Sequence, residues 1–264
     1  MRLAVCQASG TPGDVAANLR AVRRSALEAA AAGAELVVFP EAFLTGYNIG
    51  ARLAELAEPA DGPSLTALRA IAAEAGIALL CGYPERSGRT VYNAAVLVGV
   101  GGEPLLGYRK THLFGPVDRA AFAPGDGFPL AQVGPLRVGV LICYDIEFPE
   151  PARHLALAGA QLVLVPTSLM APFDVVARTL VPARAAENQI FVAYANRVGR
   201  EGDLLYVGQS CVCGPDGADL ARAGSEEEAL LVADLDPRAI ARAREESSYL
   251  HERRPALYTA LAEG

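Results

Sequence analysis

Cys143 is the residue whose surroundings best suit nucleophilic chemistry. It ends the apolar run LRVGVLI, which predicts a strand, and polar turn-forming residues and then helical periodicity follow it. A thiol at such a turn lies near backbone N–H groups and the positive end of a helix dipole, and both favour the thiolate. We therefore expect Cys143 to attack a carbonyl carbon. The alternative is a small apolar core residue, which is the commonest role of a buried cysteine.

A cysteine nucleophile needs a base, and histidine is the usual one. His154 falls within the predicted helix after Cys143, and His251 lies in a polar tail, so local sequence places neither at a site. His112, two residues after Lys110, is equally well interpreted as a structural hydrogen-bonding residue. The sequence therefore argues against a Cys–His protease.

A carboxylate can act as the base instead when burial raises its pKa. Glu41 follows the apolar run LVVFP, at the carboxyl end of a predicted strand, where α/β sheets place their sites. Lys110 likewise closes the predicted strand Leu105 to Arg109. Taken alone, each residue could be a surface charge, and Glu41 could also be a helix N-cap.

Alternating strands and helices must position these residues. The chain begins with a predicted strand from Leu3 to Ala8, a helix from Asp14 to Ala32 with Gly33 as its C-cap, and a strand from Glu35 to Phe39. The pattern recurs with helices at Ser64 to Ala75, Glu150 to Ala158 and Asp174 to Asn188, followed by strands at Ile77 to Gly82, Leu162 to Val165 and Ile190 to Tyr194.

Other predicted strands lack intervening helices: Val91 to Val100 and Pro104 to Tyr108, joined by a Gly101-Gly102 hairpin, then Tyr206 to Cys213 and Ala229 to Leu235. The sheets are therefore mixed. Strands that are apolar throughout need cover on both faces, which predicts an α/β fold with two sheets stacked between helical layers. No linker divides the 264 residues, so we expect a single domain over 1–264. Its C-terminal tail, 237–264, is either a solvated surface segment or docks on a partner subunit.

Composition limits the partners. A formal charge of −7 argues against nucleic acid. No apolar run reaches the roughly 20 residues of a membrane-spanning helix, so no membrane partner is expected. The first residues do not form a secretion signal, which predicts a cytoplasmic protein.

The cysteines are expected to be free. They are five in number and widely spaced, which argues against a disulfide framework. The close pair, Cys211 and Cys213, alternates along a predicted strand, and only three histidines are scattered through the chain. We therefore expect no metal and no other cofactor.

Three segments occur together, VVFPEAFLTGY around Glu41, YRKTHLF around Lys110 and CYDIEFPE around Cys143. In this order they resemble the nitrilase superfamily of carbon–nitrogen hydrolases. The agreement continues in FAPGD, PARAAENQIFV and GQSCVCGPDG, and so covers nearly the whole chain. Within the superfamily, FLTGYNIG, GYPER and YLHERRPALY are most similar to the aliphatic amidases that include 5-aminopentanamidase.

The resemblance implies a four-layer αββα sandwich that joins a second copy through its helical layers, giving a homodimer or a higher homo-oligomer. It implies that Glu41 takes the proton of Cys143 and passes it to departing ammonia. Lys110 and the backbone N–H of Tyr144 would stabilise the tetrahedral oxyanion. Water activated by Glu41 would then hydrolyse the thioester.

Two acids carry alternative interpretations. Asp118 stands where many members of the superfamily have a second Glu, so it either orients Lys110 or substrate, or is an exposed loop residue. Glu147, four residues after Cys143, either pairs with a substrate ammonium, which suits an ω-amino amide, or orients Lys110 or caps the helix. Further candidates for the pocket wall, by position, are Tyr47, Asn48 and Tyr144.

The expected activity is hydrolysis of a small aliphatic primary amide to carboxylate and ammonia. A nitrile or an N-carbamoyl amine is the alternative substrate, since the same three residues serve each and the pocket decides. A non-catalytic binding protein on the same fold is the other alternative, and the intact Glu41, Lys110 and Cys143 argue against it.

Overall fold

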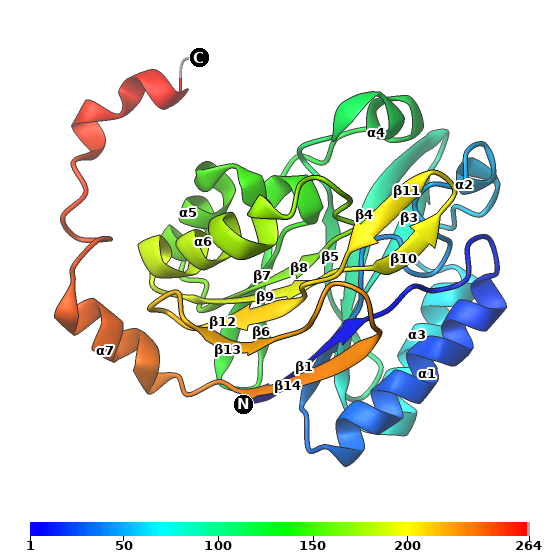
Figure 1. The fold of residues 1–264 in the computed structure, drawn as a ribbon, viewed down its shortest axis with the longest axis horizontal. Helices are drawn as coiled ribbons and strands as arrows, with labels where there is room; N and C mark the ends of the chain where they lie inside the picture. The colour runs from blue at the N-terminus through cyan, green and yellow to red at the C-terminus, as the bar shows by residue number, and fades with distance from the viewer. Residues whose placement is uncertain (263–264) are drawn as a thin grey trace.

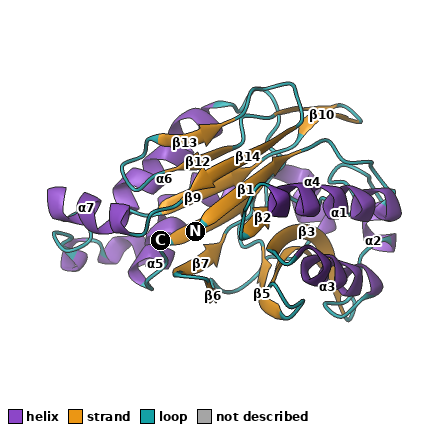
Figure 2. Ribbon diagram, turned by 90° about the horizontal axis from the view of Figure 1, so that it is seen from below, coloured by secondary structure: helices purple, strands orange, loops and turns teal. Residues whose placement is uncertain are grey.

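The computed structural model describes residues 1–262, whose strands form two stacked six-stranded sheets and a two-stranded ribbon (Figure 1). The first sheet has the order β14-β1-β2-β3-β4-β5 and the second β13-β12-β9-β8-β7-β6. Helices α1 and α3 flank the first sheet and α5 and α6 the second, as Figure 2 shows. The predicted αββα sandwich is confirmed.

The elements have the following bounds. The first sheet contains β1 (Arg2–Gln7), β2 (Leu36–Val38), β3 (Ala78–Ser87), β4 (Thr90–Val98), β5 (Pro104–Arg109) and β14 (Ala229–Asp234). The second contains β6 (Leu130–Val133), β7 (Leu136–Val140), β8 (Leu162–Pro166), β9 (Phe191–Ala195), β12 (Cys211–Cys213) and β13 (Asp219–Arg222). The ribbon is β10 (Val198–Glu201) with β11 (Leu204–Val207).

The α-helices are α1 (Val15–Ala31), α2 (Arg52–Glu55), α3 (Pro63–Ala75), α4 (Gly115–Ala121), α5 (Pro149–Leu157), α6 (Val181–Asn188) and α7 (Arg238–Glu246). Cys143–Glu147, Pro255–Leu257 and Thr259–Ala262 form 3₁₀ segments, and Val176–Leu180 forms a π-helical turn.

Local sequence explains where α1 begins and ends. The Asp14 side chain caps the helix by accepting the Ala17 N–H at 2.8 Å. The observed C-cap is Ala32, and the predicted C-cap, Gly33, is the next residue, in the left-handed conformation with φ of 78°.

The inner strands β2, β8 and β9 are buried on both faces, as their apolar sequences predict. In β2, Leu36 and Val38 face the core between the sheets, whereas Val37 packs in the core beneath the helices, and all three are 0% exposed. Stacking of the sheets thus buries one face of β2, and the helical layer buries the other.

Two predicted elements are interrupted. The predicted strand from Tyr206 to Cys213 breaks because Gly208 and Gln209 take left-handed φ angles of 56° and 58°, which end β11 before β12 begins. The predicted helix from Asp174 to Asn188 is a π-helical turn followed by α6. Pro182 has no N–H to donate, so regular helical bonding is interrupted near the junction.

The C-terminal segment continues after β14 into α7, whose Ile240 joins the core, and the residues after α7 then run away from the body of the molecule (Figure 1). Leu257 in this segment is 63% exposed. Docking of the tail on a partner subunit therefore stays a prediction, which the mass of the particle in solution would test. Residues 263–264 of the predicted tail lie outside the described residues.

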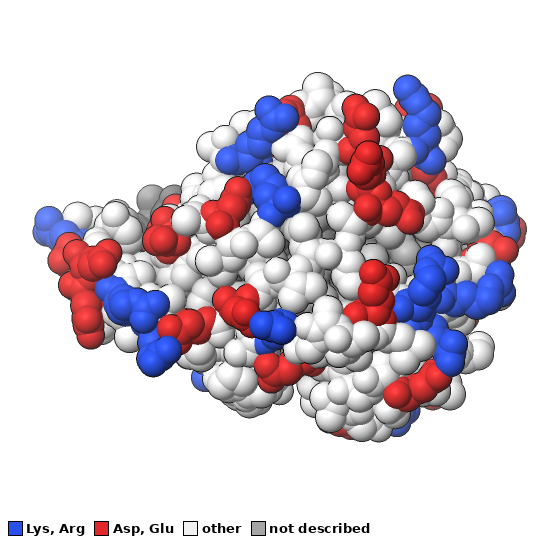
Figure 3. All heavy atoms as spheres, turned by 60° about the horizontal axis from the view of Figure 1, so that its bottom comes forward, with Lys and Arg blue, Asp and Glu red and all other residues white. Residues whose placement is uncertain are grey.

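The surface bears charges of both signs. On the face shown in Figure 3, basic and acidic side chains are interspersed. Among the helices of residues 1–262, none has the length and apolar character needed to cross a membrane.

Candidate active site

Strand ends from both sheets meet at the candidate site. Glu41 follows β2 and Lys110 follows β5 in the first sheet, while Cys143 follows β7 in the second. Thr167 follows β8 of the second sheet, and its carbonyl accepts a hydrogen bond from the backbone N–H of Glu41 at 3.4 Å. This bond links the two sheets. Carboxyl ends of parallel strands are where α/β sheets place their sites, and stacking brings two such edges together.

A buried ion cluster forms the centre of this edge. Lys110 Nζ donates to Glu41 Oε1 at 2.8 Å and to Asp118 Oδ2 at 2.7 Å, and all three side chains are 0% exposed. Asp118 Oδ1 also accepts from the Tyr47 hydroxyl at 2.7 Å. Asp118 is therefore not an exposed loop residue: it lies on α4 and binds the Lys110 ammonium together with Glu41.

The cluster holds two carboxyl groups and one ammonium, and this excess of acidic groups affects the protonation of Glu41 and Lys110. Burial raises the pKa of Glu41, and the charge of Asp118 raises it further, while Lys110 lowers it. For Lys110, burial works to lower the pKa, but Glu41, Cys143 and Asp118 outweigh it and the pKa lies well above its usual value. Lys110 therefore stays protonated, and the raised pKa of Glu41 makes it the carboxyl group that more readily takes up a proton.

Cys143 lies on a sharp turn, with φ of 48° and 9% of its surface exposed. Burial and the charge of Glu41 raise the pKa of its thiol, against the opposing effects of Lys110, Thr167 and Ser168. The expectation of a resting thiolate is thus wrong. Cys143 opens a 3₁₀ segment, and α5 begins only at Pro149, so no α-helix dipole starts at the sulfur.

Asp145 ties the nucleophile turn to the segment that carries Lys110. Its Oδ2 accepts the Ile142 N–H at 2.9 Å and the Tyr108 hydroxyl at 2.8 Å. Its Oδ1 accepts the backbone N–H of His112 at 2.9 Å, and the His112 ring lies against the same oxygen at 2.8 Å. His112 therefore has the structural hydrogen-bonding role, and Asp145 is a site residue that sequence reasoning missed.

Two further buried polar residues hold Glu41. Asn93 Nδ2 donates to Glu41 Oε1 at 2.7 Å. Arg197 donates through Nε to the Glu41 carbonyl at 3.2 Å and through Nη2 to the Ala42 carbonyl at 2.8 Å, where Ala42 has φ of 46°. Both side chains are 0% exposed. Asn93 is a polar residue at the start of the apolar run YNAAVLV. A buried polar residue needs a hydrogen-bond partner, so this pattern could have indicated that Asn93 binds another buried polar group.

The predicted pocket-wall residues separate into two groups. Tyr47 joins the ion cluster, and half-buried Tyr144 packs edge-on against Phe114 and Phe148 at 5.2 and 4.9 Å between ring centroids. Asn48 points elsewhere, since its side-chain amide donates to Asp203 at 2.8 Å.

Glu147 is half-buried beside the site. Burial raises the pKa of its carboxyl to about 6, and Lys110 opposes this shift. Arg184 binds the backbone carbonyl of Glu147 at 2.8 Å and directs another nitrogen to Glu187 at 3.0 Å. Arg184 therefore does not form an ion pair with the Glu147 carboxylate and does not neutralise it.

A separate cluster of two thiols and a carboxylate has ligand types that metals use, but an arginine already neutralises its carboxylate. Cys211, Cys213 and Asp219 place ligand atoms within 4.8 Å of one another. However, Arg222 occupies both Asp219 oxygens, at 2.6 and 2.7 Å. Its guanidinium disfavours a cation there, so these residues do not fit a metal.

Comparisons with known proteins place the chain among amide-cleaving enzymes. The sequence model described as "Carbon-nitrogen hydrolase" matches residues 2–245. The chain is 50% identical to the "Hydrolase in pqqF 5'region" of Pseudomonas protegens, over 99% of this chain and 92% of that protein. It is 41% identical to the (R)-stereoselective amidase of a Pseudomonas species, over 96% and 92%.

A solved amidase has the same fold. The amidase of Nesterenkonia sp. AN1 with acrylamide added at its active-site cysteine superimposes with a TM-score of 0.90, at 38% identity, over 99% of each chain. A cysteine-to-alanine mutant of the same amidase in complex with butyramide gives a TM-score of 0.88, at 39% identity, over 98% of this chain and 96% of that one.

Proposed function

We propose that this chain, which belongs to the carbon–nitrogen hydrolase family and acts on carbon–nitrogen bonds of linear amides, hydrolyses small aliphatic primary amides through a thioester on Cys143. The observation that carries the proposal is the fully buried Lys110 ammonium, shared between Glu41 and Asp118 at 2.8 and 2.7 Å beside the cysteine turn. The amidase neighbours, one of them solved with butyramide, support a small aliphatic substrate.

In the first step Glu41 removes the Cys143 proton while the sulfur attacks the amide carbon. Because the pKa of the thiol is raised, a free thiolate is scarce, and proton transfer accompanies attack. A carboxylate whose pKa is raised by burial is a stronger base than an exposed one and suits this transfer.

In the second step the developing oxyanion is stabilised by Lys110 and by the backbone N–H of Tyr144. Lys110 stays charged, and its hydrogen bonds to Glu41 and Asp118 fix its position, so little reorganisation is needed as charge develops. Glu41 then gives its proton to the departing ammonia and activates the water that hydrolyses the thioester.

For the substrate we propose an ω-amino amide, with Glu147 as the partner of its ammonium. Glu147 is half-buried, and Arg184 does not neutralise its carboxylate. A partly desolvated carboxylate attracts a cation more strongly than an exposed one. Nitriles and N-carbamoyl amines are the alternative substrates.

The test is ammonia release from 5-aminopentanamide, butyramide, aliphatic nitriles and N-carbamoyl amines, with Cys143→Ala as the blank. We expect both amides to be hydrolysed. For 5-aminopentanamide, KM should rise as pH falls through about 6, where Glu147 takes up a proton and loses its charge. KM for butyramide should not follow this change.

Glu147→Gln is the matched variant for this panel. It should raise KM for 5-aminopentanamide about 10-fold and leave butyramide unchanged. An equal effect on both amides would rule out ammonium recognition, and release from nitriles alone would rule out the amidase.

A further inference from the structure

The carboxylate of Glu41 is held asymmetrically. Its Oε1 accepts two hydrogen bonds, from Lys110 Nζ at 2.8 Å and from Asn93 Nδ2 at 2.7 Å. Its Oε2 is buried and has no hydrogen-bond partner among residues 1–262. One oxygen is therefore saturated, and the other is free to accept a proton.

We propose that Asn93 is a positioning residue for amide hydrolysis: it fixes the rotation of the Glu41 carboxylate so that Oε2 is the oxygen that exchanges protons with Cys143 and ammonia. The proposal rests on the function proposed above, because it assigns Asn93 to the base of that reaction. Asn93 acts only through Glu41 and needs no contact with the substrate.

The position of Asn93 suits this role because one residue is tied to both charged partners. Asn93 lies on β4, and its backbone carbonyl accepts the Lys110 N–H at 2.8 Å. Its side chain reaches Glu41, which follows a different strand of the same sheet. Replacing the side chain removes the bond to Glu41 and keeps the backbone bond that places Lys110.

A second donor is needed because the last torsion of a glutamate side chain is soft. Lys110 alone can follow a rotating carboxylate, since its ammonium carries three donors. Asn93 is anchored in a buried strand and donates from a fixed direction. Two donors on Oε1 therefore select one rotation of the carboxyl group.

The free oxygen of Asn93 is a second sign that this residue serves chemistry. Asn93 Oδ1 is buried and has no hydrogen-bond partner in the part of the chain that the structure describes. An unpaired buried acceptor is unfavourable to folding, whereas an apolar side chain would leave none. The fold thus keeps an amide where leucine would remove the unpaired oxygen.

The protonation of Glu41 depends on all the groups that face it. Lys110, Asp118, Cys143 and Tyr47 surround the carboxyl group, and Arg197 binds the backbone carbonyl. Within this set the Asn93 hydrogen bond favours the charged carboxylate and lowers the pKa of Glu41. Loss of Asn93 should therefore move the acidic limb of the pH–rate profile to higher pH.

The experiment measures kcat, KM and the pH dependence of kcat/KM for butyramide with Asn93→Leu and Asn93→Ala. We expect kcat to fall about 10- to 100-fold in both variants, with KM changed less than about threefold, and the acidic limb to shift upward. The melting temperature should change by less than about 4 °C, because the lost bond is offset by the lost unpaired acceptor.

Asn188→Leu is the matched control. Asn188 is also fully buried, donates one hydrogen bond, to the Arg184 carbonyl at 2.9 Å, and has an unpaired Oδ1 within the described residues. Its variant should keep the wild-type kcat and acidic limb.

Wild-type kcat and pH profile in both Asn93 variants would overturn the proposal, as would a fall in kcat matched by Asn188→Leu. If Cys143→Ala instead hydrolysed butyramide at the wild-type rate, the proposed function itself would fail. The two failures are thus distinguishable.

Discussion

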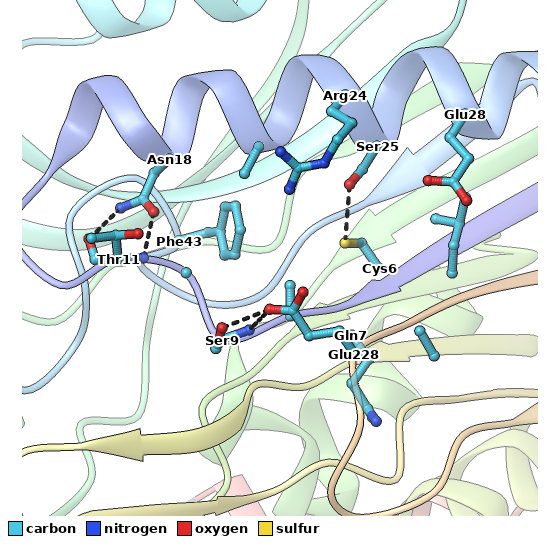
Figure 4. Close-up of a pocket in the computed structure, with 15 residues that line it drawn as sticks. Cys6, Gln7, Ser9, Thr11, Asn18, Arg24, Ser25, Glu28, Phe43 and Glu228 are labelled. Atoms are coloured by element: carbon cyan, nitrogen blue, oxygen red, sulfur yellow. Dashed lines mark hydrogen bonds between the residues drawn. The ribbon is translucent and has the colours of Figure 1, made fainter.

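Two buried cysteines in this molecule have similar burial and different surroundings. Cys6 lies in β1 in the wall of a cavity of about 280 Å³, beside Ser25 and near Glu228 (Figure 4). Burial raises the pKa of Cys6 to about 12, and its sulfur lies 3.8 Å from the Ser25 hydroxyl. Cys143 is also buried, and its pKa is also raised.

The difference lies in what stands beside each sulfur. Cys6 lies within β1, and both acids that line its cavity, Glu28 and Glu228, are exposed. Glu228 accepts from Ser9 Oγ at 2.6 Å. Cys143 follows a strand end and has a buried acid, Glu41, and a buried cation, Lys110, beside it. We therefore expect hydrolysis at Cys143 and not at Cys6, because a thiol whose pKa is raised needs a desolvated base beside it.

The largest expected contrast is between Cys143→Ala and Cys6→Ala. We expect Cys143→Ala to lower kcat/KM for butyramide by about 10⁴-fold or more, because no other group can form the thioester. Cys6→Ala should keep full activity and lower the free energy of unfolding by about 1 kcal/mol, through loss of a small buried group. Ammonia release and urea unfolding measure the two effects, and an equal loss of activity in both would erase the distinction.

The next contrast compares Glu41, beside Cys143, with Glu228, beside Cys6. Glu41→Gln keeps the shape of the side chain and removes the base, so kcat should fall about 10²- to 10⁴-fold. Glu228→Gln makes the same change at the Cys6 cavity and should leave kcat as in the wild type. Steady-state rates at pH 7 decide the matter; a Glu41→Gln enzyme with wild-type kcat would assign the base elsewhere.

The smallest contrast concerns Asp118, which contacts Lys110 and not the sulfur. Asp118→Asn preserves the hydrogen bonds in part but removes a negative charge beside Lys110, so kcat should fall about 10-fold. The same variant removes a charge that raises the pKa of Glu41, so the acidic limb of kcat/KM should move to lower pH. An unchanged profile together with unchanged turnover would remove Asp118 from the site.

The sequence predicts the layers and the places of Glu41, Lys110 and Cys143 because these features are local. Strand patterns mark both faces of β2, and each candidate residue follows such a run directly. Glu41 and Lys110 are 69 positions apart, yet they follow β2 and β5, which run in the same direction in one sheet, so topology places both residues at the same end of that sheet.

The burial of Asp118 and the hydrogen bonds of Asn93 and Asp145 could not be predicted in the same way. Each depends on a contact between distant segments, such as the 52 positions between Asn93 and Glu41. The thiol pKa was mispredicted for a related reason. The desolvation that raises it comes from the stacked sheets, which the sequence around Cys143 does not contain.

The last strand among the described residues, β14, pairs with the first, β1, and forms an edge of the first sheet. All six residues of β1, Arg2 to Gln7, pair with Ala229 to Asp234 in antiparallel register. During synthesis on the ribosome, more than 200 residues are therefore added after β1 before its partner β14 exists, and until then the hydrogen-bonding groups on this side of β1 are unpaired. A nascent chain released before residue 229 would present this apolar edge to its neighbours, which makes early termination products candidates for aggregation and for chaperone binding.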